Sequence, residues 1–88
     1  MEGSTEPMPA VTLRFIFISE AEKPVVALKV PDDMLFQEAL VMAAKKQGKD
    51  ASVLTATLPG GSSITGGTVR EVADSSANIH VIDPSIVG

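Results

Sequence analysis

The chain has 88 residues, of which 44% are apolar and 20% charged, and its net charge at neutral pH is −4. These values are typical of one small globular domain; they argue against a disordered chain and against a nucleic-acid-binding protein with a basic surface. The lack of cysteine excludes disulfides and thiolate metal sites, and no apolar run approaches the ~20 residues of a membrane-spanning helix.

The first strand is predicted at residues 11–18, VTLRFIFI, after a polar, proline-containing stretch at residues 1–10 that we expect to be a flexible arm. Alternate residues of this strand form one wholly apolar face, which we assign to the core. Ile16 and Ile18 then lie on the outer face, where they either fill the sheet surface or contact another molecule. The inward residues are Val11, Leu13, Phe15 and Phe17.

A second strand is predicted at residues 25–30, VVALKV, after a short charged turn at residues 19–24. The short connection indicates an antiparallel hairpin. Pro24 and Pro31 bracket the second strand, and proline is tolerated at strand ends and edges, so we expect this strand to form an edge of the sheet.

One full helix is predicted at residues 36–48, FQEALVMAAKKQG. We expect Asp32 or Asp33 to cap its first turn and Gly48 to end it in a left-handed conformation. At 100° per residue, one side of the helix collects the residues that we expect to face a sheet. They are Phe36, Ala39, Leu40, Ala43 and Gln47.

The remainder of the chain alternates short elements with turns. A weak third strand is predicted at residues 52–58, one or two helical turns at 68–73, and a last strand at 78–82. The spacing Thr68-x-x-Glu71 is that of a capping box. The single histidine, His80, falls in the last strand, where a solvent-facing role is favoured over a catalytic one.

This order of elements predicts an α+β fold of the β-grasp, or ubiquitin-like, kind. We expect a mixed sheet of about four strands, with one main α-helix across one face and a short helical turn before the last strand. The first strand is expected at the centre, with the last strand parallel to it. The predicted domain covers residues 11–82, and residues 83–88 form a flexible C-terminal tail.

The sequence offers little material for catalysis or cofactor binding. One histidine and no cysteine leave few nucleophile–base pairs, and the paired glycines lack the Lys-Ser/Thr of a phosphate-binding loop. We therefore expect no enzyme activity, no catalytic residue, no metal and no cofactor.

Four stretches together resemble the ubiquitin-fold modifiers of the ufmylation pathway, over most of residues 11–88. The most specific is LKVPDDMLFQEALVMAAKK, in which a strand runs through Val-Pro and acidic residues into a helix with Ala-Ala. The others are VTLRFIF, NIHVID and the closing Val-Gly.

The resemblance implies a covalent protein modifier. Gly88 would be the acyl donor, adenylated by an activating enzyme that uses ATP, passed as a thioester to a conjugating enzyme, and joined by a ligase to target lysines through an isopeptide bond. The catalytic cysteines would belong to these partners, and a dedicated protease would mature and remove the modifier. The implied location is the cytoplasm and nucleus, with conjugates at the endoplasmic reticulum surface, and the implied state is a monomer without membrane insertion.

The tail departs from the family pattern. Ser85 and Ile86 stand where family members commonly carry basic residues, and no lysine follows Lys49, so chain formation through the family's usual lysine is in doubt. The tail residues expected to be recognised by the enzymes are Pro84, Ser85, Ile86 and Val87. Two alternatives stay open: a β-grasp sulfur carrier, although such proteins usually end in Gly-Gly, and a purely non-covalent ubiquitin-like binding module.

A second contact surface is predicted between the second strand and the helix. If that strand is an edge, a partner peptide can add to it, and the resemblance implies that a short motif of the activating enzyme binds in such a groove. The residues expected to line it are Val26, Leu28, Lys29, Val41 and Lys45.

Overall fold

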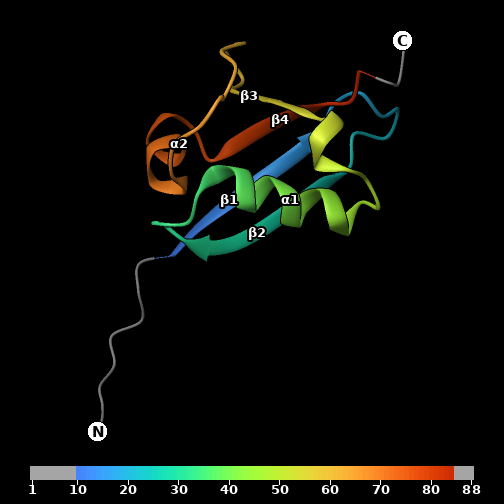
Figure 1. The fold of residues 1–88 in the computed structure, drawn as a ribbon. Coiled ribbons are helices and arrows are strands. Elements are labelled where there is room, and N and C mark those ends of the chain that lie inside the picture. The colour runs from blue at the N-terminus through green and yellow to red at the C-terminus, as the bar shows by residue number, and fades with distance from the viewer. Residues whose placement is uncertain (1–9, 85–88) are drawn as a thin grey trace, which may run out of the picture.

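The computed structural model describes residues 10–84 and forms one four-stranded sheet with two α-helices packed against it (Figure 1). The predicted order of elements is confirmed. In chain order the elements are β1 (Ala10–Phe17), β2 (Val25–Pro31), α1 (Phe36–Lys46), the 3-10 helix η1 (Ala51–Val53), β3 (Thr55–Thr57), α2 (Val69–Ser75) and β4 (Asn78–Ile82).

The strands lie in the order β2-β1-β4-β3. β1 pairs antiparallel with β2 and parallel with β4, and β3 pairs antiparallel with β4. The predicted central place of the first strand, its parallel pairing with the last strand and the edge position of the second strand are therefore confirmed. This is the arrangement of a β-grasp.

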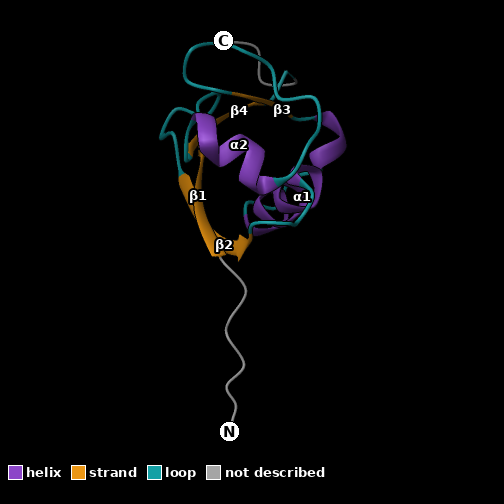
Figure 2. Ribbon diagram, turned by 90° about the vertical axis from the view of Figure 1, so that its left-hand side faces the viewer, coloured by secondary structure: helices purple, strands orange, loops and turns teal. Residues whose placement is uncertain are grey.

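The core lies between the sheet and the two helices, which occupy its concave side (Figure 2). Alternate residues of β1 point into this core: Leu13 and Phe15 are fully buried and Phe17 is 1% exposed. The ring of Phe36, in the first turn of α1, stacks on Phe15 with 5.9 Å between ring centroids. This contact fixes the start of α1 against β1, at the centre of the sheet.

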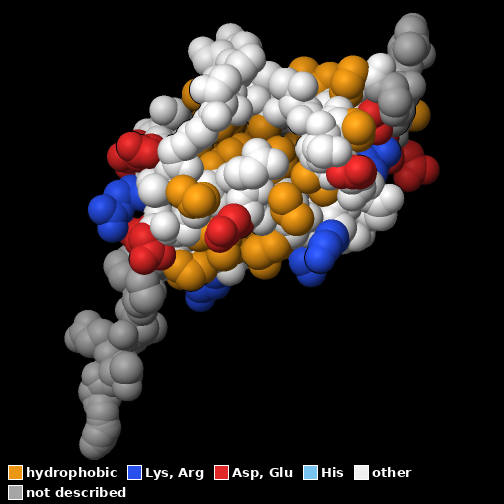
Figure 3. Space-filling view, in the orientation of Figure 1, with side chains coloured by type: hydrophobic (Ala, Val, Ile, Leu, Met, Phe, Trp, Pro, Cys, Tyr) orange, Lys and Arg blue, Asp and Glu red, His pale blue; other side chains and the backbone are white. Residues whose placement is uncertain are grey.

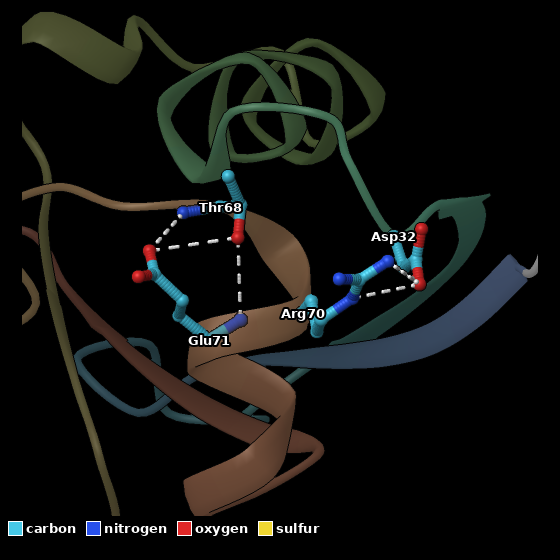
Figure 4. A network of polar contacts seen from close by, with 4 residues as sticks. All are labelled: Asp32, Thr68, Arg70 and Glu71. Atoms are coloured by element: carbon cyan, nitrogen blue, oxygen red, sulfur yellow. Dashed lines mark hydrogen bonds and ion pairs between the residues drawn. The ribbon is translucent and has the colours of Figure 1, made fainter.

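The start of α1 differs from the prediction. Its N-cap residue is Leu35, without a side-chain cap. Asp32 instead accepts two hydrogen bonds from the Arg70 guanidinium, at 3.0 and 2.9 Å (Figure 4). Asp32 is only 8% exposed, so a distant cation that can pair with its carboxylate outweighs a local cap. The pair ties the β2–α1 connection to α2.

The end of α1 follows the prediction. Gly48 adopts a φ of +69°, a left-handed conformation that glycine enters without steric cost. Its N–H donates to the carbonyl of Lys45, and the N–H of Lys49 donates to that of Ala44. The backbone at Lys49 is thus fixed to the last turn of the helix.

The weak third strand is shorter than predicted. Its first residues form η1, because the Asp50 side chain accepts hydrogen bonds from the backbone N–H and the hydroxyl of Ser52. This local bonding competes with an extended chain. The same hydrogen bonds, the backbone one first, lower the pKa of Asp50.

The predicted capping box of α2 is confirmed. The N–H of Glu71 donates to Thr68 Oγ1 at 3.3 Å, and the N–H of Thr68 donates to Glu71 Oε1 at 2.9 Å (Figure 4). Gly67, directly before the cap, has a φ of +97°, and a Cβ atom built there would lie 2.6 Å from Glu71 Oε1.

We expect Gly67→Ala to lower the free energy of unfolding by about 1–3 kcal/mol, because the new side chain is strained in the left-handed region and displaces Glu71 from the capping box. Urea unfolding followed by circular dichroism measures the change. Gly66→Ala is the matched control, since Gly66 has no positive φ and a Cβ there would meet nothing within 4 Å. Equal losses for the two variants would contradict the assignment.

Among the described residues, no helix covers the outer face of the sheet (Figure 2). Ile16 and the His80 residue that pairs with it are half-buried there, whereas Ile18, predicted as the last residue of the strand, lies in the turn after β1 and is also half-buried. Val25, on the edge strand, is 55% exposed. His80 thus has the strand position that its place in the sequence predicts.

Candidate functional site at the root of the C-terminal tail

The chain leaves the sheet at the end of β4. This end lies beside η1 and the β1–β2 turn (Figure 1). Asp83 directly follows the strand and is only 6% exposed, whereas Pro84 is exposed. The predicted tail residues Ser85, Ile86, Val87 and the acyl donor Gly88 lie outside the described residues.

Asp83 is held by two segments that are far from it in sequence. Its backbone N–H donates to Ser19 Oγ at 2.9 Å, and its Oδ2 atom accepts a hydrogen bond from Lys49 Nζ at 3.1 Å. The flexible tail predicted from the sequence includes Asp83, but these contacts place Asp83 in the folded part of the chain. We call the four residues that meet here the tail root: Ser19, Glu20, Lys49 and Asp83.

Lys49 carries the positive charge of the tail root. Its Nζ atom also lies 3.5 Å from Glu20 Oε2, a buried atom whose negative charge the ammonium neutralises. The hydrogen bond to Asp83 is the main cause that raises the pKa of Lys49 above 10.5, followed among the raising effects by the charge of Glu20. The Lys49 ammonium is therefore charged at neutral pH and loses its proton only as the pH rises past that elevated pKa.

The sequence carries a signal for this cluster that our prediction missed. β1 and β4 are parallel neighbours, so the residues that follow their carboxyl ends must lie close together. Ser19 and Asp83 occupy these positions. Lys49 belongs to neither strand, so the strand pairing does not predict its contact with Asp83. That contact depends on how α1 packs on the sheet.

An open hollow of about 580 Å³ adjoins the tail root, between α1 and the segment that leads into η1. Lys49 belongs to both, since its side chain lines the hollow while its ammonium binds Asp83. The face that carries α1 shows hydrophobic side chains between scattered charges (Figure 3). The hollow is lined by Gln37, Val41, Lys45, Gly48, Lys49, Asp50, Ala51 and Ser52.

The structure does not bring the five predicted groove residues together. Val41, 37% exposed, and Lys45 line the hollow beside η1, and none of the residues that line this hollow belongs to β2. Val26 and Leu28 are buried in the core, and Lys29 is exposed on the edge strand.

The sequence predicts the angle of Val41 around α1 correctly, but it does not predict that η1 lies beside that flank of the helix. An angle of 140° from Phe36 places a residue on one flank of a helix without saying which element packs beside that flank. Met42 lies 100° further round α1, across the exposed face, and is 40% exposed. It therefore lies on the flank opposite the hollow.

Comparisons with known proteins give no assignment: neither a protein-family model nor a curated protein matches the chain. Within residues 10–84, no helix has the length and apolar character needed to cross a membrane. In the same part of the chain, no three or more acidic or histidine side chains are grouped so that they could hold a metal ion.

Proposed function

We propose that this chain is a ubiquitin-like protein modifier of the ufmylation type, joined through Gly88 to lysines of target proteins. The motifs quoted above suggest this family. The observation that supports it most is the exit of the chain: β4 pairs with the central strand and leads directly into Asp83, so the tail starts from a fixed point on a compact domain.

The chemistry of the tail fits an acyl donor. A free carboxylate is a poor acyl donor and needs adenylation before a thiol can attack it. Gly88, once its carboxylate is free, has no side chain to obstruct a narrow enzyme channel. Pro84, exposed just beyond the tail root, has a restricted φ and favours an extended path away from the domain.

The proposal places the catalytic groups in the partners. An activating enzyme, a conjugating enzyme and a ligase would act in turn on the tail, and a protease would mature and release the modifier. ATP would be used by the activating enzyme and not bound by this chain. We propose the cytoplasm and nucleus as its location, with conjugates at the endoplasmic reticulum surface.

The test is incubation of the full chain with a ufmylation activating enzyme and ATP, followed by intact-mass analysis of the enzyme. We expect an adduct with the mass of the chain that dithiothreitol releases, as a thioester requires. A thiocarboxylate on the chain in the presence of a sulfur donor would instead support the sulfur carrier. The absence of any adduct would support the non-covalent binding module and contradict the proposal.

We also propose that the edge strand β2 docks a short peptide of the activating enzyme by strand addition, since within residues 10–84 β2 pairs on one side only, with β1. Because Val41 lines the hollow, we propose that Met42, on the flank of α1 away from the hollow, borders that peptide in its place. Lys29, exposed on the same strand, would lie beside the peptide.

We expect Met42→Asp to weaken binding of this peptide about tenfold or more, because it places a charge against an apolar contact. Isothermal titration measures the affinity. Val41→Asp, on the opposite flank and equally exposed, is the matched control and should leave the affinity within twofold. If only Val41→Asp weakens binding, the peptide occupies the hollow beside η1 and not the β2 groove.

A further inference from the structure

We propose that the Lys49–Asp83 ion pair is a positioning device, which fixes the direction in which the tail leaves the domain and so presents it to the activating enzyme. The inference rests on the proposed function for its enzymatic consequence, but its structural part can be tested without any enzyme. Lys49 is then a positioning residue that acts through Asp83 and never touches the reacting carboxylate.

The tail root fixes Asp83 from two directions. Ser19, just beyond β1, holds the backbone through the Asp83 N–H, and Lys49, just beyond α1, holds the side chain. A residue gripped at both its backbone and its side chain loses most of its rotational freedom. Asp83, from which the tail begins, is therefore held in one orientation.

The anchoring lysine is itself held rigidly. The Lys49 N–H donates to the carbonyl of Ala44 at 2.8 Å, which attaches the residue to the last turn of α1. Its side chain is only 21% exposed, and its ammonium reaches Asp83 Oδ2 at 3.1 Å. The position of α1 on the sheet therefore determines where the Lys49 ammonium meets Asp83, at the start of the tail.

The environment of Asp83 requires such a partner. Its side chain is only 8% exposed, and a carboxylate so little hydrated is unfavourable unless it is paired. Glu20, which shares the same ammonium at 3.5 Å, would repel the Asp83 carboxylate if Lys49 lost its charge. We therefore expect neutralisation of Lys49 to expel the Asp83 side chain from its site.

The consequence for the reaction is a change in how readily the tail is captured. An enzyme that binds a pre-oriented tail does not have to order its first residues. Loosening the tail root should therefore raise the KM of the activating enzyme for this chain, while kcat, which depends on groups around Gly88, should hardly change.

The decisive experiment compares Lys49→Met with wild type in adenylation and thioester assays over a range of modifier concentrations. We expect KM to rise about five- to tenfold with kcat within twofold. Lys49→Arg, which keeps the charge, should recover most of the loss. Lys46→Met is the matched control, because Lys46 is exposed and makes no ion pair among the described residues, and its KM should equal that of wild type.

Two further variants, Asp83→Asn and the double variant, distinguish the loss of this ion pair from a general loss of stability. Asp83→Asn should raise KM as Lys49→Met does, and the double variant should be no worse than either single one, since both remove the same interaction. Purely additive effects, or a fall in kcat with KM unchanged, would overturn the proposal. Circular dichroism checks that every variant is folded at the assay temperature.

An enzyme-free measurement separates this inference from the proposed function. Backbone ¹⁵N relaxation of the Asp83 amide should report a rigid residue in wild type and increased picosecond–nanosecond motion in Lys49→Met. Unchanged relaxation would refute the positioning role whatever the enzyme assays give. If wild type forms no thioester yet Asp83 is rigid and loosened by the variant, the proposed function fails while the tail root stands.

Discussion

Replacing Phe36 with alanine is expected to lower the free energy of unfolding by about 3–5 kcal/mol. The side chain is 2% exposed and stacks on Phe15 at the centre of the sheet, so its removal leaves a cavity that the sheet cannot close. A domain of this size is stabilised by only a few kcal/mol in total. The variant should therefore be largely unfolded at 37 °C.

Thermal and urea unfolding, followed by circular dichroism, measure this loss. Val41→Ala is the control, because it truncates an apolar residue of the same helix that is 37% exposed, and it should cost well under 1 kcal/mol. A loss of less than about 1 kcal/mol for Phe36→Ala would mean that α1 does not hold the sheet as described.

Removing Gly88 is expected to abolish thioester formation completely. Without it the terminal carboxylate belongs to Val87, whose branched side chain would stand at the reacting carbon and shorten the reach of the tail by about 3.5 Å. Intact-mass analysis of the activating enzyme measures the adduct. The shortened chain should unfold at the same temperature as wild type, since the residue lies beyond the tail root.

A residual thioester of more than a few per cent on the shortened chain would contradict the assignment of Gly88. Gly88→Ala is a gentler companion variant, because it preserves the length of the tail and adds only a methyl group. We expect it to react more slowly than wild type but faster than the shortened chain.

The elements that sequence predicted correctly depend on local patterns. The alternation in β1, the capping box of Thr68 and Glu71, and the left-handed Gly48 are each decided within a few residues. The order of the strands also followed, because the most apolar strand must be central and a parallel neighbour needs a crossover.

The features that the sequence did not predict correctly, or did not predict at all, depend on partners that are distant in the chain. Asp32 does not cap the start of α1, because its carboxylate pairs with Arg70, which lies 38 residues later in the chain. Lys49 meets Asp83 across 34 residues, and Val41 lines a hollow together with residues of η1, which follows α1 in the chain. None of these contacts follows from periodicity, since each requires the packing of elements to be known first.

The parallel pairing of β1 with β4 also governs when this protein can fold. Ser19 and Asp83 are 64 residues apart in the chain, and they are neighbours in the finished domain. During synthesis, β1 therefore waits for nearly the whole sequence before its second neighbour arrives, and until then one of its edges is unpaired. Such a non-local topology folds slowly and leaves the nascent chain open to aggregation. The tail root, which needs both Ser19 and Asp83, therefore cannot form before β4 has joined the sheet.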